Sequence, residues 1–316
     1  MPPAQLGLGL AAVARPAYIT SGRACDLGAE RDVHDLEQRT WDVLDAAVEQ
    51  GWTYVDAARS YGLAEQFLSR WLAARPDVQV RVGSKWGYRY VGGWRLDADV
   101  HEVKDHSLAA FLEQRDETLA LLGGALAVYH VHSATLETGV LEDAQVHRAL
   151  AGLRDAGTRV GISTSGPAQA DAVRRALEVV VDGAPLFTSV QTTWNVLETS
   201  AGDALAEAAA AGAQVLVKEP VANGRLAPGG ADGPGAQRVH DLAAGLGVGA
   251  DVLALAAGLR QPWATTVLSG AVTPEQVRSN AAAARLVVPE DVAQELDGLA
   301  EPPAEYWAAR SRRPWG

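Results

Sequence analysis

The chain has 316 residues, of which 48% are hydrophobic and 21% charged, and its formal net charge is −12. This composition is ordinary for a soluble globular protein, and the acidity argues against nucleic acid as a partner because phosphate binding requires a basic surface. The single cysteine, Cys25, excludes an intrachain disulfide and fits a cytoplasmic location. Residues 1–14 lack the basic segment of a signal peptide, and no run approaches about 18 apolar residues, so we expect no membrane partner.

Short apolar runs alternate with segments of helical spacing along the whole chain. We predict strands at 6–10, 53–56, 79–84, 126–131, 158–162, 187–190, 214–217 and 265–268. We predict helices at 32–50, 62–74, 105–122, 143–156, 167–181, 201–211, 235–260, 273–284 and 289–299. Strands that alternate with helices pair in parallel, and eight such pairs in about 300 residues favour a closed barrel over an open sheet. The expected fold is an α/β fold, a (β/α)8 TIM barrel that forms a single domain over residues 1–316.

Two long loops are expected, at 86–104 after the third strand and at 218–236 after the seventh. The second loop is rich in glycine and proline, a composition that flexible linkers share. Both loops follow the C-terminal ends of strands, where barrel enzymes carry their chemistry, so we expect active-site loops.

Four ionisable residues follow three neighbouring strands of this predicted barrel. Asp56 and Tyr61 come after the second strand, Lys85 after the third and His132 after the fourth. A tyrosine titrates at about pH 10, so proton exchange near neutrality requires a neighbouring ammonium, which Lys85 can supply while Asp56 holds it. His132 can bind and polarise a carbonyl oxygen. None of the four is a good nucleophile, so the pattern predicts a cofactor-dependent step, for which hydride transfer is the natural candidate.

Aromatic side chains are frequent near the same rim. Trp86, Tyr88 and Trp94 lie in the loop after the third strand, and Trp194 follows the sixth strand. Aromatic walls favour apolar substrates or rings that stack, such as a sugar or an aromatic aldehyde. We predict that these residues contact the substrate, and packing on the outside of the barrel is the alternative.

The chain carries four motifs around these residues. The segment Asp56-Ala-Ala-Arg-Ser-Tyr-Gly is similar to Asp-Thr-Ala-x-x-Tyr-Gly, and Gly161-Ile-Ser is similar to Gly-Val-Ser. The segment Gln191-Thr-Thr-Trp-Asn is similar to Gln-x-x-Tyr-Asn, and the segment 269–280 is similar to a closing cofactor motif. These four motifs occur in the aldo-keto reductases, which the chain resembles from Gly7-Leu-Gly onward to residue 285.

The resemblance implies an enzyme that transfers a hydride between a nicotinamide cofactor and a small aldehyde, ketone or alcohol. It implies a catalytic tetrad, with a tyrosine as general acid, at Asp56, Tyr61, Lys85 and His132. It also implies a set of cofactor contacts at Gly9, Ser163, Gln191, Lys218, Pro220, Asn223, Gly224, Arg225, Gly270, Gln276 and Asn280. Among these, Ser163 and Gln191 match the positions that hold the nicotinamide carboxamide. Lys218 departs from the family, because many members have an aromatic ring there that stacks on the nicotinamide.

The cofactor that the resemblance favours is NADP, and NAD stays open. A 2′-phosphate requires cations, ideally a forked guanidinium, and Arg225 and Arg278 are the candidates. Gly270 and Gln276 occupy positions that are Lys and Arg in some strongly NADP-selective members.

Two other functions remain open at this point. His130 and His132 place two imidazoles on one face of a strand, as in metal-dependent barrel hydrolases, but the other histidines fall in predicted helices and loops. We therefore expect no metal site, with His130 one layer below His132 inside the barrel. The second alternative is a nicotinamide-binding regulatory subunit with slow turnover, although the only appended segment is a short basic tail at 310–313. The sequence leaves the substrate, the direction of reaction and the oligomeric state open.

Overall fold

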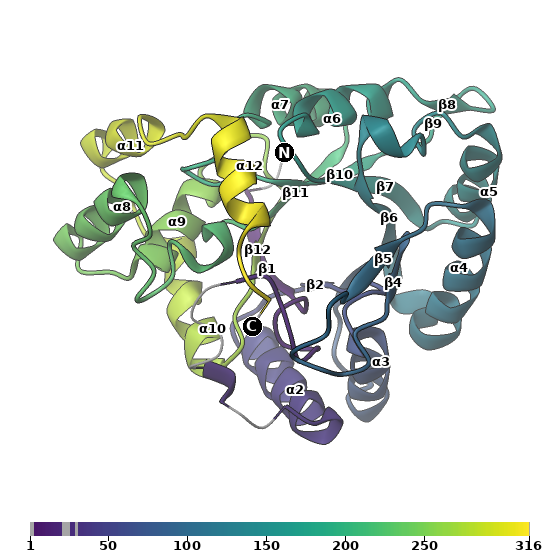
Figure 1. Cartoon of the computed structure of the whole chain (residues 1–316), viewed down its shortest axis with the longest axis horizontal. Coiled ribbons are helices and arrows are strands. Elements are labelled where there is room, and N and C mark those ends of the chain that lie inside the picture. The colour runs from purple at the N-terminus through teal and green to yellow at the C-terminus, as the bar shows by residue number, and fades with distance from the viewer. Residues whose placement is uncertain (1–2, 21–25, 29–30, 316) are drawn as a thin grey trace.

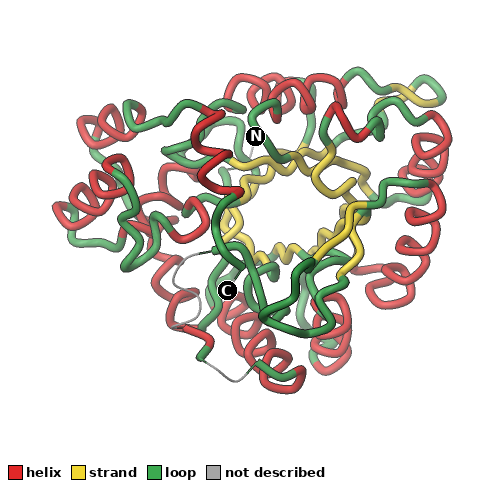
Figure 2. Tube along the Cα trace, in the orientation of Figure 1, coloured by secondary structure: helices red, strands yellow, loops and turns green. Residues whose placement is uncertain are grey.

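The computed structural model of the chain describes residues 3–20, 26–28 and 31–315, so Cys25 lies outside the described residues. Parallel strands form a closed barrel that is surrounded by helices (Figure 1, Figure 2). Around the barrel the strands are β1 (Gln5–Gly9), β12 (Thr266–Ser269), β11 (Gln214–Lys218), β10 (Ser189–Thr193), β7 (Arg159–Thr164), β6 (Leu126–Ala134), β3 (Arg81–Trp86) and β2 (Tyr54–Asp56). The predicted (β/α)8 barrel is confirmed.

The outer layer consists of helices that bury their apolar sides against the strands. In chain order they are α2 (Val33–Glu49), α3 (Ala64–Ala74), α4 (Leu108–Leu122), α5 (Ala144–Asp155), α6 (Gln169–Leu177), α7 (Gly202–Ala210), α8 (Pro234–Gly245), α9 (Ala250–Leu259), α10 (Pro274–Asn280) and α11 (Glu290–Asp297). In α2, for example, Leu36, Val43 and Leu44 recur at helical spacing and are fully buried.

Side-chain caps fix the starts of several helices. The carboxylate of Asp32 accepts a hydrogen bond from the backbone N–H of Asp35 at 2.9 Å, at the start of α2. Thr273 caps α10, and Pro274 occupies its first turn. Each cap satisfies a backbone donor that the helix itself leaves without a partner, and so determines where the helix begins.

Two predicted helices differ from the structure. The single helix expected at 235–260 is two helices, α8 and α9, because Gly247 adopts a φ of 70° and ends the first. The helix expected at 167–181 ends at Leu177, and a small antiparallel pair follows it, β8 (Val180–Val181) with β9 (Ala184–Pro185). Among the described residues no single helix is long and apolar enough to cross a bilayer; α8 and α9 reach that length and composition only together, across a 95° bend.

Two further elements lie over the mouth of the barrel. The long loop after β3 contains an antiparallel hairpin, β4 (Tyr88–Tyr90) with β5 (Glu102–Lys104). A helix that the sequence analysis did not predict, α12 (Pro303–Ser311), crosses the opposite side of the mouth, near β11 (Figure 1). The C-terminal ends of the strands therefore open into a space with walls on two sides.

Candidate active site

The C-terminal ends of the strands open into a cavity of about 310 Å³. Its lining comes from the ends of β1, β2, β6, β10, β11 and β12, from the hairpin β4–β5, and from the region of α12. This is the face on which barrel enzymes place their chemistry, because each strand points its last side chains and the following loop toward the same opening.

The cavity floor contains a buried ion pair between β2 and β3. Lys85 is fully buried, and its Nζ donates hydrogen bonds to Asp56 Oδ2 and, at 2.9 Å, to the backbone oxygen of Ala57. The other carboxylate oxygen, Asp56 Oδ1, accepts a hydrogen bond from Gln191 Nε2 on β10 at 2.7 Å. Asp56 is therefore held by side chains from two other strands, and both of its oxygens have a partner.

Tyr61 lies directly above this ion pair. The Nζ of Lys85 is 4.8 Å from the centre of the Tyr61 ring, and the guanidinium carbon of Arg15 is 4.9 Å from it. The imidazole of His132 approaches the same ring edge-on, with 5.5 Å between the ring centres. The structure thus brings together all four residues of the predicted tetrad.

The protonation states of the site differ in one respect from the sequence-based expectation. Burial, followed by the nearby Asp56 carboxylate, raises the pKa of Tyr61 well above its usual value. Burial likewise lowers the pKa of Lys85, while the ion pair with Asp56 opposes this shift. The ammonium does not bring the pKa of Tyr61 toward neutrality, because Asp56 balances its charge and the phenol ring is desolvated. At neutral pH Tyr61 is a protonated hydroxyl, which is the form that can donate a proton.

His132 is uncharged at neutral pH. Desolvation, and then the positive charge of Lys85, lower the pKa of its imidazole well below the usual value. The Ser60 hydroxyl lies 3.5 Å from His132 Nδ1. A hydroxyl that donates to Nδ1 leaves the imidazole proton on Nε2, so His132 can act as a hydrogen-bond donor without carrying a charge.

Most of the predicted cofactor residues line the cavity: Gly9, Gln191, Lys218, Pro220, Asn223, Gly224, Gly270, Gln276 and Asn280. Three of them present a buried oxygen acceptor for which the described residues provide no partner: Gln191, Asn223 and Asn280. A buried acceptor without a donor is costly unless a ligand or water satisfies it. These oxygens suit the amide and hydroxyl donors of a nicotinamide nucleotide.

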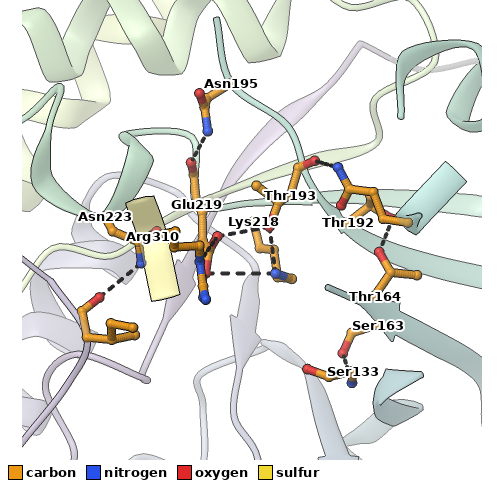
Figure 3. A network of polar contacts seen from close by, with 12 residues as sticks. Ser133, Ser163, Thr164, Thr192, Thr193, Asn195, Lys218, Glu219, Asn223 and Arg310 are labelled. Atoms are coloured by element: carbon orange, nitrogen blue, oxygen red, sulfur yellow. Dashed lines mark hydrogen bonds and ion pairs between the residues drawn. The ribbon is translucent and has the colours of Figure 1, made fainter. Parts of the chain in front are cut away.

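Two predicted cofactor residues do not line the cavity. The Ser163 hydroxyl is fully buried and accepts a hydrogen bond from the backbone N–H of Ser133 at 2.8 Å (Figure 3). The guanidinium of Arg225 pairs with Glu301 and donates to the backbone oxygen of Asp232 at 2.9 and 3.0 Å. The guanidinium of Arg225 is thus engaged within the protein, and the Ser163 oxygen already accepts one hydrogen bond.

Lys218 belongs to a charged cluster on the cavity wall (Figure 3). Its Nζ donates to Thr193 Oγ1 at 2.6 Å and lies 3.8 Å from Glu219, whose carboxylate pairs with Arg310 of α12. Burial lowers the pKa of Lys218 to about 8. Burial opposes ionisation of Glu219, but Arg310 and then Lys218 outweigh it and lower the pKa of Glu219 to about 2. The segment expected as a free basic tail therefore begins inside a helix, with Arg310 bound to the barrel.

Only one of the predicted substrate contacts, Tyr88, lines the cavity, and its ring centre lies 4.9 Å from that of His132. Trp86 is fully buried on the outer side of β3 and packs on Phe111 of α4 with 4.9 Å between ring centres. The reason is strand alternation: because Lys85 points into the barrel, its neighbour must point outward.

The other two predicted substrate residues also pack away from the cavity. The indole of Trp94 donates to the backbone oxygen of Arg31 at 2.9 Å, and Trp194 packs edge-on against Trp263 at 5.7 Å between ring centres. These positions do not favour substrate contact by the three tryptophans, which stays a prediction.

Several cavity residues were not predicted. Arg15 and Tyr18 follow β1, and Trp315 lies beyond α12, stacked on His101 with 4.6 Å between ring centres. The rule that finds Asp56 after β2, to inspect polar residues past each strand, would also have found Arg15 after β1. No comparable pattern in the sequence marks Trp315, because this residue lies at the cavity only as a result of the way α12 crosses the mouth of the barrel.

The two histidines that suggested a metal site have different partners. His130 is fully buried, and its Nε2 lies 2.9 Å from Ser189 Oγ, below the level of His132. Across the part of the chain that the structure describes, no group of three or more His, Cys, Asp or Glu residues is placed to hold a metal ion. The hydrolase alternative gains no support from this geometry.

Comparison with known proteins agrees with this fold. The structure is similar to an aldo-keto reductase, AKR11C1 from Bacillus halodurans in its holo form, with a TM-score of 0.69 and 21% identity over 94% of this chain and 92% of that chain. It is also similar to PA4992 from Pseudomonas aeruginosa, a protein assigned to the aldo-keto reductases, with a TM-score of 0.63 and 21% identity over 93% of this chain and 91% of that chain. A search of the curated proteins finds no match. The model of the aldo/keto reductase family matches residues 35–301, and the chain belongs to that family.

Proposed function

We propose that the protein is an NAD(P)H-dependent oxidoreductase that converts an aldehyde or ketone to an alcohol, or the reverse, with Tyr61 as the general acid. Membership of the aldo/keto reductase family supports an oxidoreductase acting on a small-molecule carbonyl compound. The observation that carries the proposal is the convergence of Tyr61, a buried Asp56–Lys85 pair and His132 on one cavity.

The residues of the cavity suit a nicotinamide nucleotide. When bound, a reduced nicotinamide supplies the hydride that the carbonyl carbon receives. Gln191 Oε1 is a buried acceptor next to the tetrad and would hold the carboxamide group. Asn223 Oδ1 is a second such acceptor, and Gly224, with a φ of 94°, follows it in the chain. This wall would hold the remainder of the nucleotide.

The side chains of the tetrad divide the proton chemistry between them. The Nε2–H of His132 would bind the carbonyl oxygen and orient it, and the Tyr61 hydroxyl would donate its proton to that oxygen. Proton donation leaves a phenolate whose ring lies 4.8 Å from the Lys85 ammonium, which stabilises the negative charge. One hydride at carbon and one proton at oxygen complete the reduction to the alcohol.

The substitution Tyr61→Phe tests the proposal. It removes the proton donor and keeps the ring, so we expect turnover to fall by about 100- to 10,000-fold with nearly unchanged cofactor binding. Steady-state reduction of an aldehyde panel and titration of tryptophan fluorescence with the cofactor would measure the two quantities. Tyr90→Phe is the control, because Tyr90 lies on β4 of the hairpin beside the cavity but does not line the cavity. Activity retained in Tyr61→Phe would refute the assigned role.

A further inference from the structure

Arg15 is a buried cation at the catalytic end of the cavity, where Tyr61 and the Asp56–Lys85 pair lie. It follows β1, lines the cavity and is 2% exposed. Its Nη1 donates to Glu102 Oε1 of the hairpin strand β5 at 2.7 Å. Burying a guanidinium is costly, so this charge requires partners that replace the water it has lost.

Three aromatic rings surround the guanidinium of Arg15. Its central carbon lies 4.9 Å from the ring centres of Tyr18 and Tyr61 and 5.1 Å from that of Trp315. The rings come from the segment after β1, from the loop after β2 and from the segment beyond α12. A cation over an aromatic ring is attracted by the electrons of its face, and the attraction grows when the ring itself carries negative charge.

Backbone groups fix the position of Arg15 relative to the Tyr61 ring. The Nε of Arg15 donates to the backbone oxygen of Ala11 at 2.9 Å, and its Nη1 donates to the backbone oxygen of Ser60 at 3.2 Å. The Ser60 carbonyl belongs to the peptide bond that joins Ser60 to Tyr61. The guanidinium is therefore bound directly to the loop that carries the phenol.

The charge on Tyr61 changes during the proposed reaction. Its hydroxyl is neutral before proton transfer, and the ring is negatively charged afterwards. Burial and then Asp56 raise the pKa of Tyr61, whereas Arg15 lowers it. A cation that interacts more strongly with the phenolate than with the phenol stabilises the transition state more than the bound substrate, and so raises the rate rather than the affinity.

We propose that Arg15 is a positioning residue for this reaction, which stabilises the negative charge that develops on Tyr61 as the phenol donates its proton. The inference rests on the proposed function, since it requires Tyr61 to be the general acid. Glu102 acts in the opposite direction, because its carboxylate pairs with Arg15 and offsets part of the positive charge. The buried pair thus sets how much positive charge the phenolate meets.

The rate of the first turnover tests the inference, because it reports the proton and hydride transfers before product release. The full chain is saturated with NADPH or NADH and mixed with benzaldehyde, butanal or glyceraldehyde, and the loss of reduced-nicotinamide absorbance is followed. Arg15→Met should lower this rate about tenfold, the equivalent of one pKa unit, and change KM by less than about twofold. Arg15→Lys keeps the charge and should restore most of the rate.

Arg75→Met is the matched control for the loss of an arginine that lies over aromatic rings. The guanidinium carbon of Arg75 lies 5.0 Å from the ring centre of Trp41 and 5.3 Å from that of Trp71. Arg75 also pairs with a carboxylate, that of Asp45, and does not line the cavity. This variant should leave the rate of the first turnover unchanged; a loss equal to that of Arg15→Met would overturn the inference.

Glu102→Gln distinguishes an electrostatic role from a structural one. It removes a negative charge near Tyr61 while the backbone oxygens of Ala11 and Ser60 still hold Arg15, so the first turnover should become about two- to threefold faster. A purely structural role of the pair predicts a slower reaction in both variants. Glu102→Gln also decides the question if Arg15→Met does not fold, because a slower or unchanged rate in Glu102→Gln would overturn the inference.

The Tyr61→Phe variant shows whether Arg15 acts through the phenol. No phenolate forms in this background, so adding Arg15→Met should leave the residual rate unchanged. An equal loss in the wild-type and Tyr61→Phe backgrounds would overturn the inference and leave the proposed function intact. A Tyr61→Phe variant as fast as wild type, or a wild type that reduces none of the three aldehydes with either cofactor, would overturn both.

Discussion

The two ends of the cavity are built in different ways. At the catalytic end, Lys85 and Asp56 are held by neighbouring strands of the barrel and pair with each other in a buried site. At the other end, where β12 meets α10, Gln276 of the short helix α10 donates to Asp26, which lies in a helical segment, and this contact is exposed. Strand ends have fixed spacing and hold reacting groups in place, whereas loops and short helices can vary without disturbing the barrel. The buried pair beside Tyr61 is therefore fixed by the barrel itself, whereas the exposed contact at the other end is not.

The largest effect should follow from breaking the ion pair at the catalytic end. Lys85→Met leaves the Asp56 carboxylate buried with Gln191 as its remaining side-chain partner, so we expect a loss of stability of about 3–5 kcal/mol. Turnover should also fall by about 100-fold or more, because the phenolate of Tyr61 loses its nearest cation. Urea denaturation and steady-state kinetics measure the two losses. The double variant Asp56→Asn/Lys85→Met should recover stability but not turnover; an active Lys85→Met variant would contradict the mechanism.

A smaller effect is expected where α12 is attached to the wall. Arg310→Met removes the main partner of Glu219 and leaves Lys218 at 3.8 Å, so we expect a loss of about 1–3 kcal/mol in urea denaturation. Arg174→Met is the control, since it breaks an equally well-formed but exposed pair with Glu207 and should cost less than about 1 kcal/mol. Equal losses of stability in the two variants would show that burial of the Arg310–Glu219 pair does not increase its contribution to stability.

The same cluster predicts a pH dependence of stability. Burial lowers the pKa of Lys218 to about 8, from an ordinary value of 10.5 that we take for the unfolded chain. Between these pH values the unfolded chain binds more protons, so the contribution of Lys218 to stability rises with pH. We expect wild type to gain stability relative to Lys218→Met from pH 8 to 10.5, with a constant difference below pH 8. A constant difference over the whole range would contradict the prediction.

The smallest effect distinguishes two neighbouring aromatic residues. Tyr88 lines the cavity, so Tyr88→Leu should raise KM for an aromatic aldehyde several-fold. Trp86 packs on Phe111 behind the strand, so Trp86→Phe should reduce stability and leave KM unchanged. A change in KM for Trp86→Phe alone would restore the sequence-based prediction that this residue contacts the substrate.

The sequence was a good guide where one physical rule decides the outcome. Alternating strands and helices predicted the barrel, and the meeting of strand ends predicted that Asp56, Lys85 and His132 lie together. Inspecting residues near strand ends does not predict the direction of a side chain, as Trp86 shows. The sequence places Trp86 in a loop, but it is the last residue of β3 and must therefore point to the opposite side from Lys85. Inspection of the sequence also fails for Arg310, since an apolar stripe as short as that of α12 gives little periodicity and its partner Glu219 is distant in sequence.

The protonation states could not be predicted from the sequence, for a related reason. The spacing of Lys85 and Tyr61 suggested that the lysine would lower the pKa of the phenol. In the structure, burial and Asp56 raise the pKa of Tyr61 instead. The balance between desolvation and charge depends on three-dimensional packing, which residue types at strand ends do not specify.

The hydrogen bond between Gln191 and Asp56 also fixes the orientation of an amide. Because Gln191 Nε2 faces Asp56, the oxygen of the same amide is the atom left for a ligand. That oxygen can accept from the NH2 of a carboxamide but would repel a carboxylate at the same place. On the proposed function, a cofactor with nicotinic acid in place of nicotinamide should therefore bind more weakly at this position, because the Asp56 carboxylate that pairs with Lys85 also orients the Gln191 amide.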